Sequence, residues 1–177
     1  YGKKNFFSYK YNGIAHGILD TYADRIEYVE GDYELMDGVY LIPHKTPGLE
    51  RIAKKVKLFV RENGKMFPDD FAHEHSLVFD TPKGLVIFNS CSHGGADNII
   101  TEIMATFPEK EICAYIGGLH LYKSSEEYIR EFAKRTKETG IQKIITGHCT
   151  GDEAFAILKE ELGDIVEQMY TGMNIEI

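Results

Sequence analysis

The sequence is poor in cysteine, and its few cysteines do not fit a disulfide-stabilised fold. Its 177 residues contain only Cys91, Cys113 and Cys149, an odd number. Small secreted domains that depend on disulfides carry more cysteines, usually in even numbers, whereas a sparse and odd set is typical of a reducing compartment. We therefore expect a cytoplasmic protein with free thiols.

Two further absences limit the partners that we expect. No apolar run approaches the length of about 18 residues that indicates a membrane-spanning helix. The chain also has no basic cluster, and its net charge is −8. An acidic chain does not attract nucleic acid or an anionic membrane through its overall field. The sequence thus predicts no membrane and no nucleic-acid partner, and leaves a small-molecule substrate, an anionic one included.

The first residues, Tyr1 to Asn5, show neither an initiator methionine nor a signal-peptide pattern. This start predicts a piece of a longer protein. The length nevertheless allows a buried core, and the chain shows no linker or low-complexity stretch. A single domain over residues 1–177 is therefore expected.

Hydrophobic patterning predicts an α/β chain. The clearest elements are strands at 77–79, 85–88, 112–116 and 143–146 and helices at 98–107, 125–139 and 152–162. Less clear are strands at 25–29, 39–42, 166–170 and 173–177, and a stretch at 53–60 that fits either a helix or a strand. The pairs Ser124 with Glu127 and Thr150 with Glu153 have the spacing of capping boxes.

Three histidines occupy equivalent places in this pattern. His93, His120 and His148 are 27 and 28 positions apart, and each lies in a glycine-containing loop between an apolar strand and a helix. Strands joined by crossover helices run parallel, so the three loops should meet at one sheet edge. Imidazoles beside helix N-termini suit a metal ion that holds an anionic or carbonyl substrate. The alternative, left open, is that each histidine is a hydrogen-bonded structural residue.

Acidic and imidazole side chains also cluster over residues 69–76, before the 77–79 strand. His73 lies further out in this loop than His75, which makes His73 the better metal ligand of the two. The alternative is a solvated polar approach to the strand. His16 and His44 have no supporting neighbours in the sequence, so they are interpreted as structural.

Two cysteines adjoin these candidate ligands. Cys91 lies in a polar loop near His93, and Cys149 follows His148. A soft thiolate ligand would favour zinc or iron over magnesium. The alternative for any of the three cysteines is the role of a small buried hydrophobe, and Cys113, inside a strand pattern, is assigned that role.

Five segments together resemble the metallo-β-lactamase-fold metal-dependent hydrolases, in the branch of the dihydropterin synthase of the methanopterin pathway. They are 67–74, the hairpin at 77–88, the loop Asn89–Gly95, Ile116–Leu121 and Gly147–Gly151. The resemblance covers nearly the whole chain from about Asp20. It implies an αββα sandwich with a dinuclear metal site at one edge of the sheets.

The resemblance also assigns roles to single residues. His148 matches the late metal histidine, and His73 falls where the family has a histidine before the hairpin. The loop with Cys91 and His93 falls where the metal-bridging carboxylate or cysteine stands, and which of the two is the ligand is left open. His120 would be a branch-specific catalytic residue, acting as a proton donor or a substrate ligand. Glu74, Asp69 or Thr150 would orient the imidazoles.

One family motif is missing. The string His-x-His-x-Asp-His, which supplies most of the first metal site, does not occur in the 177 residues. The resemblance therefore implies the C-terminal two-thirds of the fold, incomplete at its N-terminus. Such a chain should expose apolar surface and associate with the missing N-terminal segment or form a homo-oligomer.

The function expected from the resemblance is metal-dependent hydrolysis, in which a metal-bound water attacks an ester or phosphoester-like substrate. The metal would be divalent, with zinc favoured over iron or manganese, and the intact protein would hold two ions. One alternative is an inactive truncated scaffold or binding module of the same fold. A second alternative is a di-iron oxidoreductase, although the sequence shows no flavin motif.

Overall fold

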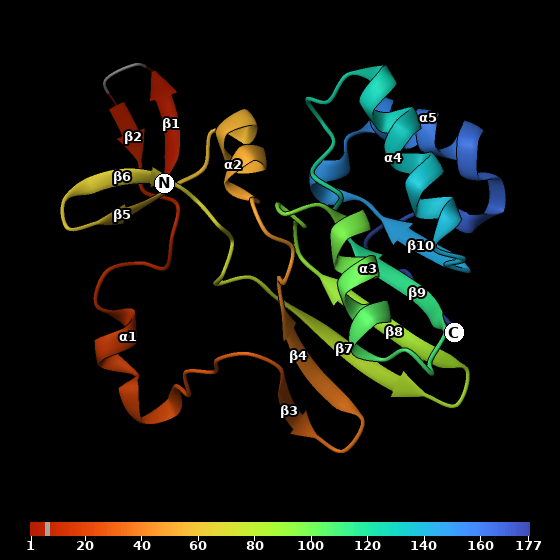
Figure 1. The fold of residues 1–177 in the computed structure, drawn as a ribbon, viewed down its shortest axis with the longest axis horizontal. Helices are drawn as coiled ribbons and strands as arrows, with labels where there is room; N and C mark the ends of the chain where they lie inside the picture. Colours follow the sequence, from red (N-terminus) through yellow and green to blue (C-terminus); the bar gives the residue numbers. More distant parts are fainter. Residues whose placement is uncertain (6–7) are drawn as a thin grey trace.

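A seven-stranded mixed sheet forms the centre of the computed structural model, which describes residues 1–5 and 8–177 (Figure 1). Its strands, in spatial order, are β11 (Val166–Gln168), β10 (Lys143–Thr146), β9 (Ile112–Gly117), β8 (Gly84–Asn89), β7 (His75–Thr81), β4 (Val39–Pro43) and β3 (Tyr33–Met36). The four strands from β8 to β11 run parallel, and the other pairs are antiparallel. The mixed α/β class predicted from the sequence is confirmed.

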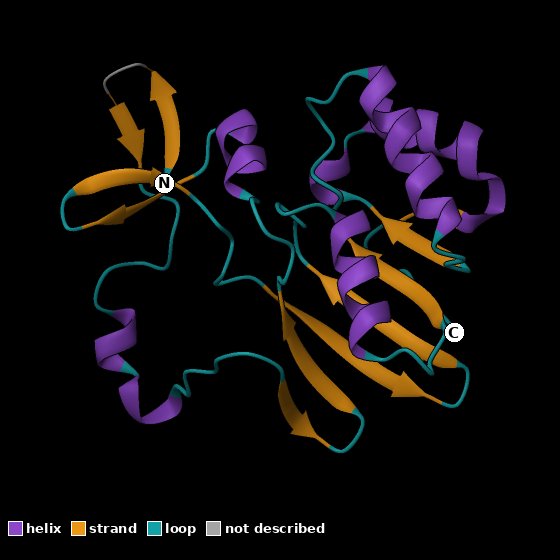
Figure 2. Ribbon diagram, viewed as in Figure 1, coloured by secondary structure: helices purple, strands orange, loops and turns teal. Residues whose placement is uncertain are grey.

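Three helices cover one face of this sheet (Figure 2): α3 (Ala96–Thr106), α4 (Glu126–Glu138) and α5 (Asp152–Leu162). Each connects two neighbouring parallel strands, which is why the apolar stripe of each helix faces the same way. The core between the helices and the sheet contains Tyr115, Ile87 and Phe132, all with 2% exposure or less. The helices thereby fix the positions of the three loops that follow β8, β9 and β10.

The opposite face of the sheet is apolar as well. Val86, Ala114, Ile116 and Ile145 form a second cluster there, with residues from 173–177 packed against it. Further along the same face Phe88 is 37% exposed. The final segment therefore covers only part of this face.

The N-terminal part forms two small hairpins and two short helices. The hairpins pair β1 (Gly2–Asn5) with β2 (Ser8–Lys10) and β5 (Phe59–Glu62) with β6 (Lys65–Pro68), and the helices are α1 (Ile18–Thr21) and α2 (Glu50–Val56). A small core of Leu49, Ala53 and Phe71 lies beneath α2. Through this core, α2 is held close to the edge at which β8 and β9 end (Figure 1).

Several expected elements differ from the structure. Residues 25–29 form no strand, because they have no neighbouring strand to pair with, and Tyr28 is 77% exposed. The ambiguous stretch at 53–60 divides into the end of α2 and the start of β5. Residues 173–177 pack against the sheet without forming a strand, and β11 ends at Gln168. The remaining predicted strands and helices are confirmed to within two residues at each end.

Both predicted capping boxes are also wrong. The N-cap of α4 is Ser125, whose hydroxyl accepts a hydrogen bond from the Tyr128 N–H at 3.3 Å. The N-cap of α5 is Gly151, which has no side chain to donate or accept. Thr150 instead accepts a hydrogen bond from the Leu119 N–H at 3.0 Å, joining two loops of the sheet edge. Thr150 has the spacing of a capping residue, but its side chain links two loops and does not cap α5.

Within residues 1–5 and 8–177, no helix has both the length and the apolar character needed to cross a membrane.

Candidate metal and substrate site

Three loops meet at the C-terminal edge of the parallel strands, as the spacing of the histidines predicts. The loops follow β8, β9 and β10, and each contains one non-glycine residue in the left-handed region: Ser92 (φ 53°), His120 (φ 51°) and His148 (φ 52°). Such conformations cost free energy and persist where the surrounding structure enforces them, most often at functional sites. Two of the predicted site residues, His120 and His148, thus lie at strained backbone positions.

Buried hydrogen bonds hold the three loops together. The Ser92 hydroxyl donates to the Gly118 carbonyl at 2.6 Å and contacts the Tyr115 hydroxyl. The hydroxyls of Thr146 and Thr150 are 2.6 Å apart, while Thr150 also accepts from the loop after β9. Complete burial raises the pKa of Tyr115, so its phenol stays protonated and can serve as a fixed hydrogen-bond partner. These hydrogen bonds thus fix the three loops, and with them the positions of the functional side chains.

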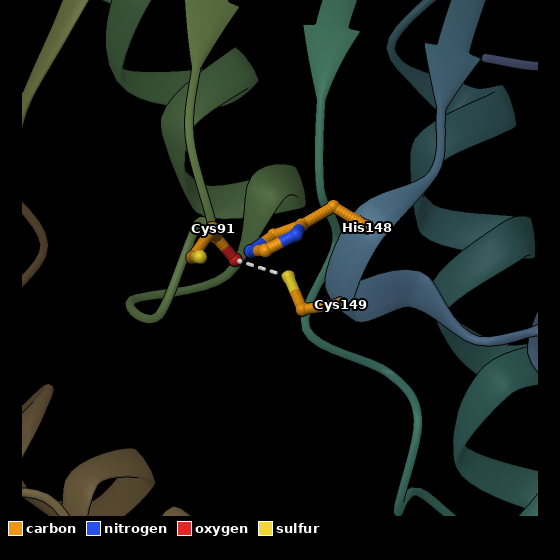
Figure 3. Close-up of side chains that lie close together, drawn as sticks. All are labelled: Cys91, His148 and Cys149. Carbon is orange, nitrogen blue, oxygen red and sulfur yellow. Dashed lines mark hydrogen bonds between the residues drawn. The ribbon is translucent and has the colours of Figure 1, made fainter. Parts of the chain in front are cut away.

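The side chains of Cys91, His148 and Cys149, which belong to two of these loops, converge (Figure 3). One ligand atom from each lies within 4.8 Å of the other two. A tetrahedral zinc ion with sulfur at about 2.3 Å and nitrogen at about 2.0 Å holds its donors about 3.5 Å apart. Small side-chain movements would close that difference. Three protein donors with an open fourth position are typical of catalytic zinc sites, so the residues present fit a thiophilic metal.

The Cys149 thiol is protonated in the metal-free protein. Burial, and next the neighbouring Cys91, raise the pKa of Cys149 to about 11. The thiol donates to the Cys91 carbonyl at 3.6 Å (Figure 3). Metal binding would have to displace this proton, so metal affinity should rise with pH.

His93 and His120 form a second group beside the cysteines. Their ring centroids are 4.7 Å apart, and His93 Nδ1 bonds to the Glu74 carboxylate. Burial, and next the nearby His93, lower the pKa of His120 to about 4. His120 is therefore neutral at pH 7, and its Nδ1 is buried without a hydrogen-bond partner in the described protein. A neutral imidazole in this position can donate or accept a hydrogen bond toward a ligand.

A buried acid–imidazole chain lies behind His93, and the sequence interpretation missed it. His44, which was interpreted as structural, bonds through Nδ1 to Glu102 at 3.1 Å, and its Nε2 lies 3.7 Å from the Glu74 carboxylate. Burial alone would lower the pKa of His44, but the bonds to Glu102 and Glu74 outweigh it and raise the value to about 9. Burial alone would raise the pKa of Glu74, but its bonds to His44 and His93 outweigh this and lower the value to about 2. Glu74 is thus an ionised carboxylate that fixes His93.

A cavity of about 460 Å³ opens beside His93 and His120, between α2 and the N-terminus of α4. Lys55, Lys57 and Lys123 line it, together with Tyr122 and apolar side chains. No aspartate or glutamate is among its lining residues, although the chain as a whole carries a charge of −8. The local excess of cationic groups suits an anionic ligand.

The structure divides the predicted site residues into three places. Cys91 and His148 lie together in the metal cluster, joined by Cys149. His93 and His120 lie together on the wall of the cavity. His73 lies outside both groups, with a side chain that is 64% exposed and an Nδ1 atom 3.6 Å from Asp69. Asp69 itself is buried and accepts from the Phe71 N–H, so it orders the loop before β7.

Comparisons with known proteins bear on the fold and the family of the chain. No family model matches the chain. The crystal structure of Tm1679, a metal-dependent hydrolase of the β-lactamase superfamily, superposes with a TM-score of 0.76 and 33% sequence identity over 85% of this chain and 57% of that one. The chain has the metallo-β-lactamase fold. The family resemblance and the fold predicted from the sequence are thereby confirmed.

A curated relative identifies the branch of the superfamily. The 7,8-dihydropterin-6-methyl-4-(beta-D-ribofuranosyl)-aminobenzene-5'-phosphate synthase of Methanocaldococcus jannaschii is 34% identical over 121 residues, which are 68% of this chain and 41% of the relative. This is the branch that the sequence motifs indicate. The chain spans less than two thirds of the length of either protein.

Proposed function

We propose that this chain carries the metal and substrate half of a metal-dependent hydrolase that acts on an ester or phosphoester bond. The observation that carries the proposal is the convergence of Cys91, His148 and Cys149 within 4.8 Å, at the sheet edge next to a cation-lined cavity. Thiolate and imidazole donors favour zinc over magnesium, with iron and manganese as the other candidates. Free cysteines in the site also favour a cytoplasmic location.

Each group of residues has a distinct part in the proposed reaction. Bound zinc would lower the pKa of water toward neutrality and polarise the bond under attack. His120, neutral at pH 7, would donate a hydrogen bond to the substrate in the cavity. His93, fixed through Nδ1 by Glu74, would exchange a proton through its other ring nitrogen.

The substrate that we propose is anionic. Lys55, Lys57 and Lys123 line the cavity, and its lining residues include no aspartate or glutamate. Helix α4 also begins there, with free N–H groups in its first turn. The name of the relative from Methanocaldococcus jannaschii includes a 5'-phosphate, which agrees with this charge. We expect the lysines to hold the anionic group while the histidines face the bond that is broken.

Zinc analysis of the chain tests the proposed metal site. The purified chain should bind about one zinc ion, and His148→Ala should weaken zinc affinity at least tenfold, since one of three donors is lost. His16→Ala is the matched control, because His16 stacks on Tyr11 in the N-terminal part. Zinc-dependent release of p-nitrophenolate from p-nitrophenyl phosphate esters would report hydrolysis. Equal zinc content in all three proteins would contradict the proposal and favour the inactive scaffold.

Anion binding tests the assignment of the cavity. Lys123→Gln should weaken the binding of inorganic pyrophosphate about fivefold, because a partly exposed charge contributes about 1 kcal/mol. The control is Lys83→Gln, in the exposed turn between β7 and β8. Isothermal titration calorimetry gives both dissociation constants. An equal effect of the two substitutions would show that only the overall charge matters and would remove the cavity from the proposal.

A further inference from the structure

Two of the three cysteines form a close pair in the structure. The Sγ atoms of Cys91 and Cys149 are no more than 4.8 Å apart, although the residues are 58 positions apart in the sequence. Both are free and partly exposed, whereas Cys113 lies within β9 and is 7% exposed. The fold has therefore brought two reachable thiols together and kept the third away from solvent.

The surroundings of the pair hold Cys149 against the loop of Cys91. A Cβ atom built on Gly118 would lie 2.6 Å from the Cys149 sulfur, so this thiol occupies the space that the glycine leaves. The Gly118 N–H in turn donates to the Ser90 carbonyl at 3.0 Å, next to Cys91. The two thiols thus lie on loops that are hydrogen-bonded to each other, and a disulfide requires the two sulfurs to approach to about 2.05 Å.

We propose that Cys91 and Cys149 form a reversible disulfide that blocks metal binding. The oxidant is a hydroperoxide such as hydrogen peroxide. One thiolate attacks the peroxide, whose O–O bond breaks, to give a sulfenic acid and one water molecule. The second thiol attacks that sulfur, the S–O bond breaks, and a second water molecule leaves. The two sulfurs lose two electrons, and the peroxide accepts them.

This inference rests on the metal site of the proposed function, because the effect of oxidation would be the loss of metal donors from that site. Disulfide formation would take two of the three donors and leave His148 alone. A single imidazole cannot replace a site of two thiolates and one imidazole. In a reducing compartment such a disulfide would be transient, as redox-sensing disulfides are. The thiol pair would therefore couple zinc occupancy to peroxide.

The first measurement is the bond itself. The full chain is treated with one equivalent of hydrogen peroxide, the free thiols are alkylated, and peptides are analysed by mass spectrometry. We expect a linkage between Cys91 and Cys149, a loss of two hydrogen masses, and reversal by dithiothreitol. Cys113→Ser should keep the linkage, whereas Cys149→Ser should abolish it. A sulfinic acid at either site without the linkage, or disulfides only between chains, would overturn the inference.

The second measurement is zinc content. The reduced chain should hold zinc, the oxidised chain should lose at least nine tenths of it, and dithiothreitol should restore it, with Cys113→Ser behaving identically. Zinc retained in the linked chain would overturn the inference while leaving the proposed function intact. A reduced chain that binds no zinc, yet forms the linkage, would count against the metal site and against control of zinc occupancy. The two measurements therefore separate the failures.

Discussion

Gly117→Ala is expected to lower the free energy of unfolding by about 3 kcal/mol or more, since the added methyl group has no space at the end of β9. A Cβ atom at this position would lie 1.9 Å from the Asn89 carbonyl oxygen and 2.9 Å from its carbonyl carbon. Gly117 and Asn89 are partners in the register between β9 and β8. Both contacts are with backbone, so no side-chain rotation can relieve them.

Urea denaturation followed by circular dichroism measures this effect. Gly140→Ala is the control: Gly140 also has a positive φ (76°), but nothing lies within 4 Å of its Cβ position. Backbone strain alone should cost this variant about 1–2 kcal/mol. Because the zinc donor Cys91 follows β8, which the added methyl group would displace, zinc affinity should also fall only in Gly117→Ala. A loss of less than about 1 kcal/mol in the free energy of unfolding of Gly117→Ala would contradict the close approach of β8 and β9.

The parts of the site that were predictable share one property, which is that topology alone brings them together. His93, His120 and His148 each follow a strand of a parallel set, so their common edge follows from the order of strands and helices. The hairpin of β7 and β8 is equally local, since a short turn joins two apolar strands. Such features depend on neighbours in the sequence or on the handedness of crossovers.

The missed residues depend on contacts that no local pattern records. His44 lies after β4 and meets Glu102 on α3 across 58 positions. One signal was present in the sequence: Glu102 falls beside Ile99 and Ile103, on the buried side of its helix. A carboxylate in that position needs a cationic or N–H partner. Naming the partner, however, required the three-dimensional structure.

His44→Gln is expected to lower stability by about 3 kcal/mol near pH 6, because it leaves two buried carboxylates without their cation. The His44 side chain is 3% exposed and that of Glu102 is 7% exposed. The backbone N–H groups of Lys45 and Thr46 still donate to Glu102, at 3.0 and 2.8 Å, and limit the loss. The exposed pair of Lys45 and Asp32 is the control, and Asp32→Asn should cost less than 1 kcal/mol.

The pH dependence of this loss has a definite sign. The folded pKa of His44 is about 9, above its ordinary value of 6.5. Its contribution to stability is therefore complete below pH 6.5 and disappears as the pH rises through 9. The pKa of Glu102 is lowered in the folded protein, so its contribution is lost on the acid side. The wild-type chain should thus lose on the order of 3 kcal/mol between pH 6.5 and 9 that the variant does not lose.

Denaturation midpoints measured from pH 5.5 to 9.5 for both proteins give this difference directly. Other groups titrate in the same range, but they do so in both chains and cancel in the comparison. His44→Gln combined with Glu102→Gln should recover part of the stability at pH 6, since the second substitution removes one unpaired buried charge. Parallel curves for the wild type and His44→Gln would show that folding does not raise the pKa of His44. In that case Glu74 would owe its charge to His93 alone.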